Sequence, residues 1–179
     1  MKTCAAKQDQ RGRKMKWLKW LLRHLHLRRS KPKVAYICGP LTDLPLEVQI
    51  ETKILYELLG SVCEYELGFR GFVPHEHTDP IKHAHFTAQE VYKRDFEQVS
   101  KRTSVLIIVA VAPSWGGGME VAWAQSANVP IIVMIPAGKK TSRLLRGGPG
   151  ILNILEYKGT TDACRLLADA LRYMRYNLN

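Results

Sequence analysis

Apolar residues after position 33 follow two patterns, and the first is a set of short, unbroken apolar runs. Such runs occur at 34–38 (VAYIC), 105–112 (VLIIVAVA) and 130–136 (PIIVMIP), each beside glycine or proline. Runs of this length that are rich in β-branched residues predict strands buried on both faces. A shorter stretch at 71–74 predicts one further short strand, because a proline ends it.

The second pattern is that of an amphipathic helix, in which apolar residues return every three or four positions. It is present at 46–59, 88–101 and 161–176, and another helix is expected from Met119. Strands that alternate with helices favour right-handed crossovers, which place parallel strands in one sheet. The order of elements therefore predicts an α/β domain whose parallel sheet is covered by helices on both faces.

Charge is distributed unevenly between the start of the chain and the rest. The net charge is +11, and residues 1–33 carry twelve Lys or Arg against one Asp, whereas residues 34–179 carry fifteen basic and fifteen acidic side chains. Proteins that bind nucleic acid need a surplus of basic groups. We therefore expect a basic extension at 1–33 and a charge-balanced domain at 34–179 that does not bind nucleic acid.

The basic extension contains a segment at 15–27 (MKWLKWLLRHLHL) with the pattern of a basic amphipathic helix, followed by a linker at 30–33. Charged residues interrupt its apolar stretch, so it lacks the continuous core of a secretory signal, although an organelle presequence would be similar. One interpretation is a helix that lies on an anionic membrane surface. The alternatives are a tail that docks on its own domain or a partner protein, or one that orders only on binding.

Localisation is indicated by two further features of the sequence. The four cysteines show no CxxC spacing, which is typical of free thiols in a reducing compartment. No transmembrane segment is expected. We therefore expect a cytoplasmic protein, with membrane association through the N-terminal helix as the alternative.

A lone carboxylate, Glu120, follows the apolar run at 105–112 and three consecutive glycines. Ligands of open α/β sheets bind at the carboxyl ends of strands, where glycine lets the backbone approach closely, so Gly116 and Gly118 are candidate binding residues. We expect Glu120 in the first turn of a helix, where the helix dipole keeps it ionised and usable as a nucleophile. The alternative is an acidic residue that only complements the dipole.

Three motifs in this order resemble one protein family. They are YICGP, the aspartate inside YKRDFEQV, and GGGMEVAWA after a buried strand. Together they are similar to the nucleoside 2-deoxyribosyltransferase family and to its hydrolase branch, the deoxynucleoside monophosphate N-glycosidases, over about residues 34–148. The resemblance implies a Rossmann-like (flavodoxin-like) fold, a small-molecule nucleoside or nucleotide as substrate, and chemistry that needs neither a metal nor another cofactor.

The resemblance also implies roles for four residues. Glu120 matches the glutamate that attacks the anomeric carbon of the sugar, and Asp95 matches the aspartate that manages the proton on the departing base. Tyr36 matches the tyrosine that orients the nucleophile, and Gly39 matches the glycine against which the ligand lies. Taken alone, Asp95 also fits an ordinary solvated carboxylate, and Tyr36 also fits a buried strand aromatic.

Two serines bear on the choice between the branches. Ser114 resembles a serine that the monophosphate N-glycosidases carry where base-exchanging transferases have an acidic residue, and a hydroxyl can donate to phosphate. Ser142 resembles a hydroxyl that reaches the phosphate from a neighbouring subunit, which implies a homodimer or a larger homo-oligomer, with Arg143 or Arg146 near it. Without the resemblance, the two serines fit a turn former and a helix cap.

The chain departs from the hydrolase pattern directly after YICG. The monophosphate enzymes usually have a serine and a nearby arginine there, whereas this chain has Pro40, Leu41 and Thr42. The departure leaves the preference for a 5′-phosphate open. Thr42 and Asp43 are candidates for binding a hydroxyl or a base edge instead.

The histidine-rich segment PHEHTDPIKHAH offers a competing interpretation. His75, His77, His83 and His85 with Asp79 include ligands for zinc or another divalent metal, and two imidazoles of an extended His-x-His point to one side. The alternatives are contact of His75 and His77 with a nucleobase, or plain surface histidines. Since the expected chemistry needs no metal, base contact is the preferred site assignment.

Three classes of function remain open. The first is an N-glycosidase that hydrolyses the base–sugar bond of a nucleoside 5′-monophosphate or nucleoside through a glycosyl-glutamate. The second is base exchange on the same scaffold, and the third is a nucleotide-binding module without turnover. The presence of Tyr36, Asp95 and Glu120 together favours an enzyme, because a binding module needs only the groups that hold the ligand.

Overall fold

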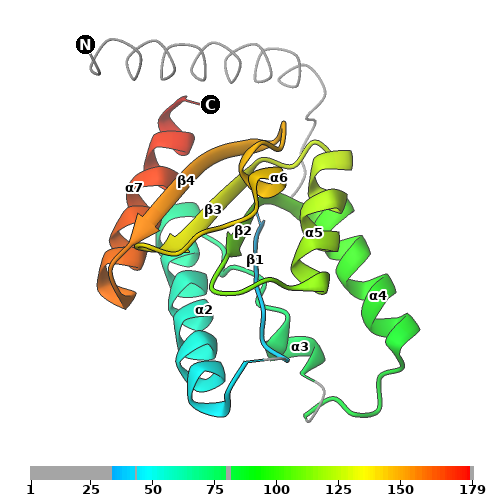
Figure 1. The fold of residues 1–179 in the computed structure, drawn as a ribbon. Helices are drawn as coiled ribbons and strands as arrows, with labels where there is room; N and C mark the ends of the chain where they lie inside the picture. Colours follow the sequence, from blue (N-terminus) through cyan, green and yellow to red (C-terminus); the bar gives the residue numbers. More distant parts are fainter. Residues whose placement is uncertain (1–33, 43, 80–81, 178–179) are drawn as a thin grey trace, which may run out of the picture. The chain divides into compact units, whose positions relative to one another are not determined.

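A computed structural model describes residues 34–42, 44–79 and 82–177, and its elements are labelled in Figure 1. The basic extension lies outside these residues. Four parallel strands form one sheet in the order β1 (Val34–Cys38), β2 (Thr103–Val109), β3 (Ile131–Pro136) and β4 (Ile151–Tyr157). The predicted α/β class with a parallel sheet is confirmed.

The outer edge of β1 carries a fifth, minimal strand. Phe72 forms a parallel bridge to Tyr36, with Ile37 N donating to Phe72 O at 2.9 Å and Phe72 N donating to Ala35 O at 2.7 Å. The strand expected at 71–74 is therefore only this bridge. Counted with it, the sheet has the flavodoxin-like strand order 2-1-3-4-5.

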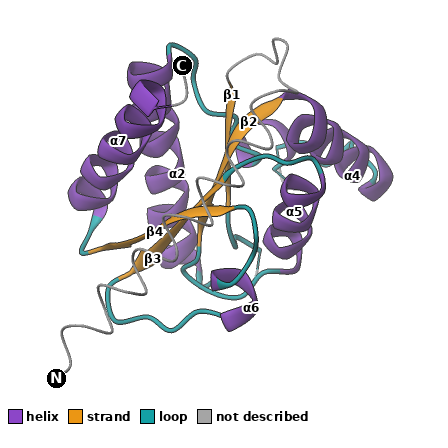
Figure 2. Cartoon of the chain, turned by 90° about the horizontal axis from the view of Figure 1, so that it is seen from above, coloured by secondary structure: helices purple, strands orange, loops and turns teal. Residues whose placement is uncertain are grey.

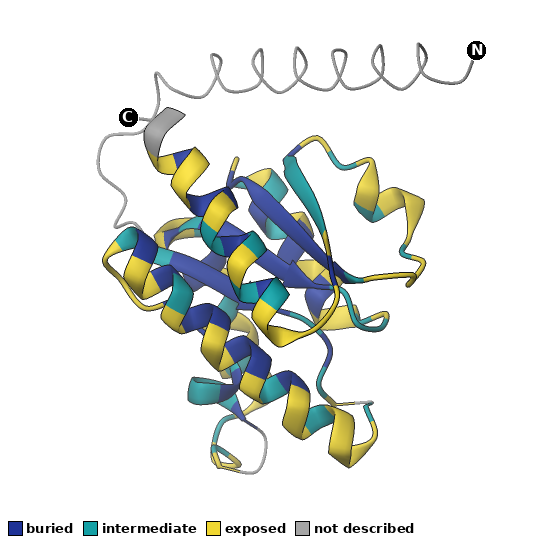
Figure 3. Cartoon of the chain, turned by 90° about the vertical axis from the view of Figure 1, so that its left-hand side faces the viewer, coloured by how far each residue is buried: buried dark blue, intermediate teal, exposed yellow. Residues whose placement is uncertain are grey.

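Helices cover both faces of the sheet, as Figure 2 shows. α2 (Leu46–Leu67) and α7 (Thr160–Asn177) lie on one face, and α4 (Ala88–Glu97) and α5 (Trp115–Ser126) lie on the other. Neighbouring residues of β2 enter different cores, since Ile107 packs with the α2 and α7 side and Leu106 with the α5 side. Strands β1, β2 and β3 are mostly buried while the outer helix faces are exposed (Figure 3), which is the expected consequence of a sheet covered on both faces.

The carboxyl ends of α2 and α4 differ from the sequence expectation. α2 continues beyond residue 59 to Leu67, where Gly68 at φ 82° ends it by donating its N–H to Glu64 O at 2.9 Å. A left-handed residue at this position is most easily supplied by glycine. α4 continues into a π-helical turn, Gln98–Arg102, before β2 begins. Two short helices, α3 (His75–Thr78) and α6 (Arg143–Arg146), complete the elements.

No helix in the part of the chain that the structure describes is long and apolar enough to cross a membrane.

Candidate active site

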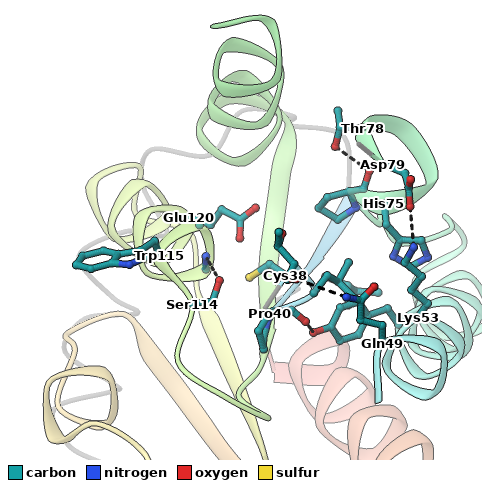
Figure 4. A pocket seen from close by; sticks show the side chains of 18 of the residues that line it. Cys38, Pro40, Gln49, Lys53, His75, Thr78, Asp79, Ser114, Trp115 and Glu120 are labelled. Atoms are coloured by element: carbon teal, nitrogen blue, oxygen red, sulfur yellow. Dashed lines mark hydrogen bonds and ion pairs between the residues drawn. The ribbon is translucent and has the colours of Figure 1, made fainter. Parts of the chain in front are cut away.

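A cavity of about 450 Å³ opens at the carboxyl ends of β1 and β2, between α2, α3 and the start of α5 (Figure 4). This is the edge of the sheet at which open α/β folds bind ligands. All of the described residues that line it precede position 121. They are Ile37, Cys38, Gly39, Pro40, Leu41, Thr42, Gln49, Lys53, Tyr56, Pro74, His75, Thr78, Asp79, Pro113, Ser114, Trp115, Gly116, Gly117 and Glu120.

A hydrogen bond joins Glu120 on the cavity wall to Tyr36, which lies behind the wall on an element distant in sequence. Tyr36 Oη donates to Glu120 Oε1 at 2.6 Å, and both side chains are buried. Tyr36 is held in place by β1 and by the ring of Phe72, whose centroid lies 5.4 Å from its own. The short O–H···O distance is typical of a donor that meets a carboxylate. The structure therefore places two of the three expected catalytic residues in direct contact.

The expectation that Glu120 is fully ionised at neutral pH is wrong. Burial raises the pKa of Glu120 to about 7, the hydrogen bond from Tyr36 lowers it in part, the negative charge of Asp95 raises it, and the thiol of Cys38 lowers it. α5 begins at Trp115, so Glu120 lies beyond the first turn. Loss of water contact therefore outweighs the helix dipole, and the carboxyl group is only partly ionised near pH 7.

Ser114 explains why α5 begins four residues before Met119. Its Oγ accepts a hydrogen bond from Gly117 N at 3.2 Å, and its carbonyl oxygen accepts from Gly118 N at 3.1 Å. A serine N-cap satisfies amide groups that would otherwise lack partners, so the three glycines form the first helical turn instead of a loop. Ser114 and Gly116 line the cavity, whereas the exposed Gly118 does not.

Asp95 lies on α4 and is half-buried, but it is not among the described residues that line the cavity. Its Oδ1 is buried without a hydrogen-bond partner in the described chain. Burial raises the pKa of Asp95 to about 6, against the lowering effect of Arg94. Its charge raises the pKa values of Glu120 and Tyr36, so it lies close enough to influence both electrostatically.

Cys38 is a site residue that the sequence analysis missed. It is buried, it lines the cavity, and its thiol donates a hydrogen bond to Glu120. Burial raises the pKa of this thiol well above its usual value, with the charge of Glu120 adding to the shift. Alternate residues of a strand share a face, so the position two residues after Tyr36 in YICGP is the signal that identifies it.

Gly39 is required by close packing at the end of β1. A Cβ atom there would meet the Tyr56 hydroxyl and would lie 2.6 Å from the backbone oxygen of Val109. The Tyr56 hydroxyl occupies this space because it donates to Pro40 O at 3.1 Å. Gly39 therefore lets the first strand end against the cavity floor.

The histidines do not form the extended His-x-His arrangement that the sequence analysis considered. His75 and His77 lie on α3, a single helical turn, where residues two apart point in different directions. His75 is buried on the cavity wall, whereas His77 is not among the lining residues and stacks on Phe72 with ring centroids 4.4 Å apart. The described residues contain no group of three or more His, Cys, Asp or Glu that could hold a metal ion.

The wall opposite Glu120 carries an ion pair that the sequence did not reveal. Lys53 Nζ lies 2.7 Å from Asp79 Oδ2, and the Asp79 side chain is 4% exposed. Asp79 Oδ1 also accepts from Lys82 N at 3.1 Å. Lys53 is the one Lys or Arg among the described residues that line the cavity, and its charge is balanced by Asp79.

The candidate contacts to a phosphate or a base edge at Thr42 and at Ser142 lie in different places. Thr42 lines the cavity together with Pro40 and Leu41, whereas Asp43 lies outside the described residues. Ser142 is exposed, caps α6 by accepting from Leu144 N at 3.2 Å, and does not line the cavity of its own chain.

The chain is similar to known proteins at the level of solved structures. No protein-family profile and no curated protein matches it. Solved structures do: the Clostridium botulinum CMP N-glycosidase BcmB has 18% sequence identity and a TM-score of 0.57 over 77% of this chain and 99% of its own. The chain has the fold of BcmB. BlsM, solved in solution, has 21% identity and a TM-score of 0.60 over 83% of this chain and 96% of its own.

These likenesses confirm the Rossmann-like fold that the sequence resemblance implied. Each neighbour is covered almost completely by this chain, so the similarity extends over the whole α/β domain and is not limited to a shared strand–helix unit. At these identities the comparison concerns the fold, and function has to be argued from the site.

Proposed function

We propose that the protein is an N-glycosidase that hydrolyses the bond between base and sugar of a nucleoside or nucleoside 5′-monophosphate through a covalent glycosyl–Glu120 intermediate. One observation carries the proposal: a buried carboxyl group on the wall of a nucleoside-sized cavity, with its Oε1 held 2.6 Å from the Tyr36 hydroxyl. A carboxylate fixed in this way can meet a sugar carbon that develops positive charge and can later leave it. The name of BcmB, a CMP N-glycosidase with this fold, agrees with the proposal.

The reaction proceeds in two displacement steps. In the first, a carboxylate oxygen of Glu120 forms a bond to the anomeric carbon, the carbon–nitrogen bond breaks, and its electron pair stays on the base, which takes up a proton. In the second, water attacks the same carbon and gives up a proton, and the ester electrons return to Glu120. The Tyr36 hydroxyl orients Glu120 throughout, and the resemblance assigns the proton on the base to Asp95.

Two sets of features give opposite indications about whether the substrate carries a 5′-phosphate. Ser114 and the N-terminus of α5 lie at the cavity and favour an anionic group such as phosphate. The cavity also contains a cation already paired with Asp79, and it lacks the serine and arginine that usually follow YICG. We therefore include both nucleosides and their 5′-monophosphates in the proposed substrate class.

The decisive experiment is an incubation with ribonucleosides, deoxynucleosides and their 5′-monophosphates, with chromatographic detection of free base. We expect base release from at least one of them, and mass spectrometry of a slow 2-fluoro analogue should find the sugar attached to Glu120. A protein that releases no base from any of these substrates, yet binds one of them, would be the binding module instead.

Base exchange is the second candidate, because one observation favours it. Glu120 is only 8% exposed, so a glycosyl ester there is shielded from bulk water and could persist until another base enters. Adding a second free base to the incubation distinguishes the two reactions. A new nucleoside would indicate transfer, whereas free sugar alone would indicate hydrolysis.

We also propose a homo-oligomer in which Ser142 of one subunit approaches the cavity of another. The exposure of Ser142 on α6 is compatible with this arrangement. The mass in solution tests the oligomer, and a loss of activity on monophosphates but not on nucleosides in Ser142→Ala tests the contact.

The proposed membrane contact of residues 15–27 is tested by sedimentation with anionic vesicles with and without residues 1–30.

A further inference from the structure

One polar group on the cavity wall has no partner. His75 is 6% exposed, and its Nδ1 is buried with no hydrogen-bond partner among the described residues. Its other nitrogen, Nε2, lies 3.0 Å from Glu57 Oε1. A carboxylate can only accept, so Nε2 carries a hydrogen, and Nδ1 accepts a hydrogen bond in the neutral ring and donates one only when the ring is protonated on both nitrogens. Burial of such an atom is costly unless a ligand or water meets it.

The direction of the proposed attack determines which wall of the cavity the departing base faces. A carboxylate that displaces a base approaches the sugar carbon from the face opposite the leaving group. The base must then point away from Glu120. Figure 4 shows Glu120 entering the cavity from α5 on one side, and His75 with Lys53 and Asp79 on the other. The departing base is therefore directed toward the wall that contains His75.

We propose that His75, protonated on both ring nitrogens, donates its Nδ1 proton to the nucleobase as it leaves, and that Glu57 orients the ring for this step. The inference rests on the proposed N-glycosidase function and adds the group that activates the leaving base. In the first step, the proton moves from Nδ1 to the base as the carbon–nitrogen bond breaks. In the second, the neutral Nδ1 accepts the proton released by the attacking water, so His75 is restored.

Glu57 is suited to this positioning role by its contact with Nε2. Its side chain is 49% exposed, so it remains solvated while it balances the charge of a doubly protonated ring. A carboxylate behind an imidazole fixes the ring and its tautomer in the same way in hydrolases that use histidine. Glu57 does not line the cavity, so it acts through His75.

The neighbouring acids and bases are less suited to this task. Asp95 lies outside the set of described cavity-lining residues, and its charge acts on Glu120 and Tyr36 instead. Lys53 is held by Asp79 at 2.7 Å, so proton loss from it would leave the buried Asp79 without its cation.

The test compares substrates whose bases differ in how readily they leave without a proton. The substrate found in the incubation panel is used together with analogues that carry electron-withdrawing substituents on the base. We expect His75→Gln to lower kcat/KM about 100-fold or more on the poorest leaving base, and less than about fivefold on the best one. Glu57→Gln should show the same trend with a smaller loss, and its half-exposed side chain makes it a safe second variant should His75→Gln fail to fold.

His85→Gln is the matched control, because His85 is exposed and lies outside the lining residues. It should leave the dependence on the leaving base as in the parent protein. Equal losses on all bases in both His75→Gln and Glu57→Gln would overturn the proposal, and so would a selective loss in Asp95→Asn that the His75 variant lacks. Absence of base release by the parent protein would instead reject the proposed function itself.

Discussion

Two buried carboxyl groups face each other across the cavity, and their surroundings differ. Asp79, on the α3 side, lies 2.7 Å from the ammonium group of Lys53. Glu120, on the α5 side, has no cation in contact among the described residues and is held by the Tyr36 hydroxyl and the Cys38 thiol. Both are almost fully removed from water, at 3% and 8% exposure.

The difference teaches which carboxylate is available for chemistry. Asp79 is stabilised as an anion by its partner, and any bond it formed would leave a buried ammonium ion uncompensated. In the part of the chain that the structure describes, Glu120 is buried and receives only neutral donors, so its negative charge is weakly stabilised and its pKa is raised to about 7. Neutralising Glu120 by bonding to a sugar carbon is therefore favourable in a way that it is not for Asp79.

The largest expected effect is the difference in turnover between two variants, each of which replaces one of the two carboxyl groups by an amide. Glu120→Gln should lower the rate of base release about 10³-fold or more, since it removes the nucleophile. Asp79→Asn should cost less than about tenfold, because it disturbs only the charge balance of the wall. The rates are measured by chromatography on proteins with matching circular dichroism spectra. Similar losses in both variants would remove the distinction between the two walls.

The next effect is on stability and has opposite signs for the two groups. The folded protein holds the Glu120 proton up to about pH 7, whereas the ordinary value is 4.5, so its ionisation lowers stability as pH rises between these values. The loss amounts to about 3 kcal/mol above pH 7. Glu120→Gln should therefore be more stable than the parent at pH 8 and equal to it near pH 4.5, as measured by urea unfolding.

Asp79→Asn should be less stable than the parent at pH 8, because it leaves Lys53 without its counter-charge. A gain in stability for this variant, or no pH dependence of the Glu120→Gln difference, would contradict the contrast between the paired and the unpaired carboxyl group.

Removing the Tyr36 hydroxyl has a smaller effect on rate and a directional effect on pH dependence. Tyr36→Phe should lower kcat/KM about 10- to 100-fold, the range for a hydrogen bond to a charged group. On a substrate whose base leaves readily without a proton, kcat/KM of the parent protein should rise with pH through about 7 as Glu120 ionises. Tyr36 lowers the pKa of Glu120, so its loss should move this rise to higher pH. A pH profile that stays in place would show that the contact does not tune Glu120.

The smallest expected effect concerns Cys38. Its thiol is a weak donor that also lowers the pKa of Glu120, so Cys38→Ala should reduce kcat/KM by only about two- to fivefold and move the pH profile in the same direction as Tyr36→Phe. Cys38→Ser is the matched control, since it keeps a donor and should retain the parent profile. Identical profiles in the two variants would exclude the thiol from the site.

Much of the fold could be predicted from the sequence because its strands are unbroken apolar runs. VAYIC coincides with β1, and the run at 130–136 differs from β3 by one residue. β4 was not predicted, because its sequence, ILNILEY, contains a polar Asn and Glu and is mostly only half-buried at the sheet edge. An edge strand is defined by its neighbour, which a local pattern does not reveal.

The candidate site was predicted less completely, because its properties depend on packing. The contact between Tyr36 and Glu120 joins residues 84 positions apart, and motif order alone brought them together. The predicted ionisation of Glu120 was wrong. The start of α5 is set by the Ser114 cap and the burial of Glu120 by neighbouring elements, and a local pattern reveals neither. Lys53 and Glu57 lie on α2, whereas their partners Asp79 and His75 lie at the end and the start of α3. The sequences of these two helices do not indicate that the side chains meet.

All described residues that line the cavity precede position 121, whereas β3, β4 and α7 complete the sheet and cover one of its faces. The lining of the cavity and the rest of the sheet are therefore provided by successive parts of one polypeptide. Substitutions in the final third can therefore change solubility or assembly while the cavity of the same chain keeps its lining, provided that the strands still pair and Ser142 is kept for the proposed contact between subunits.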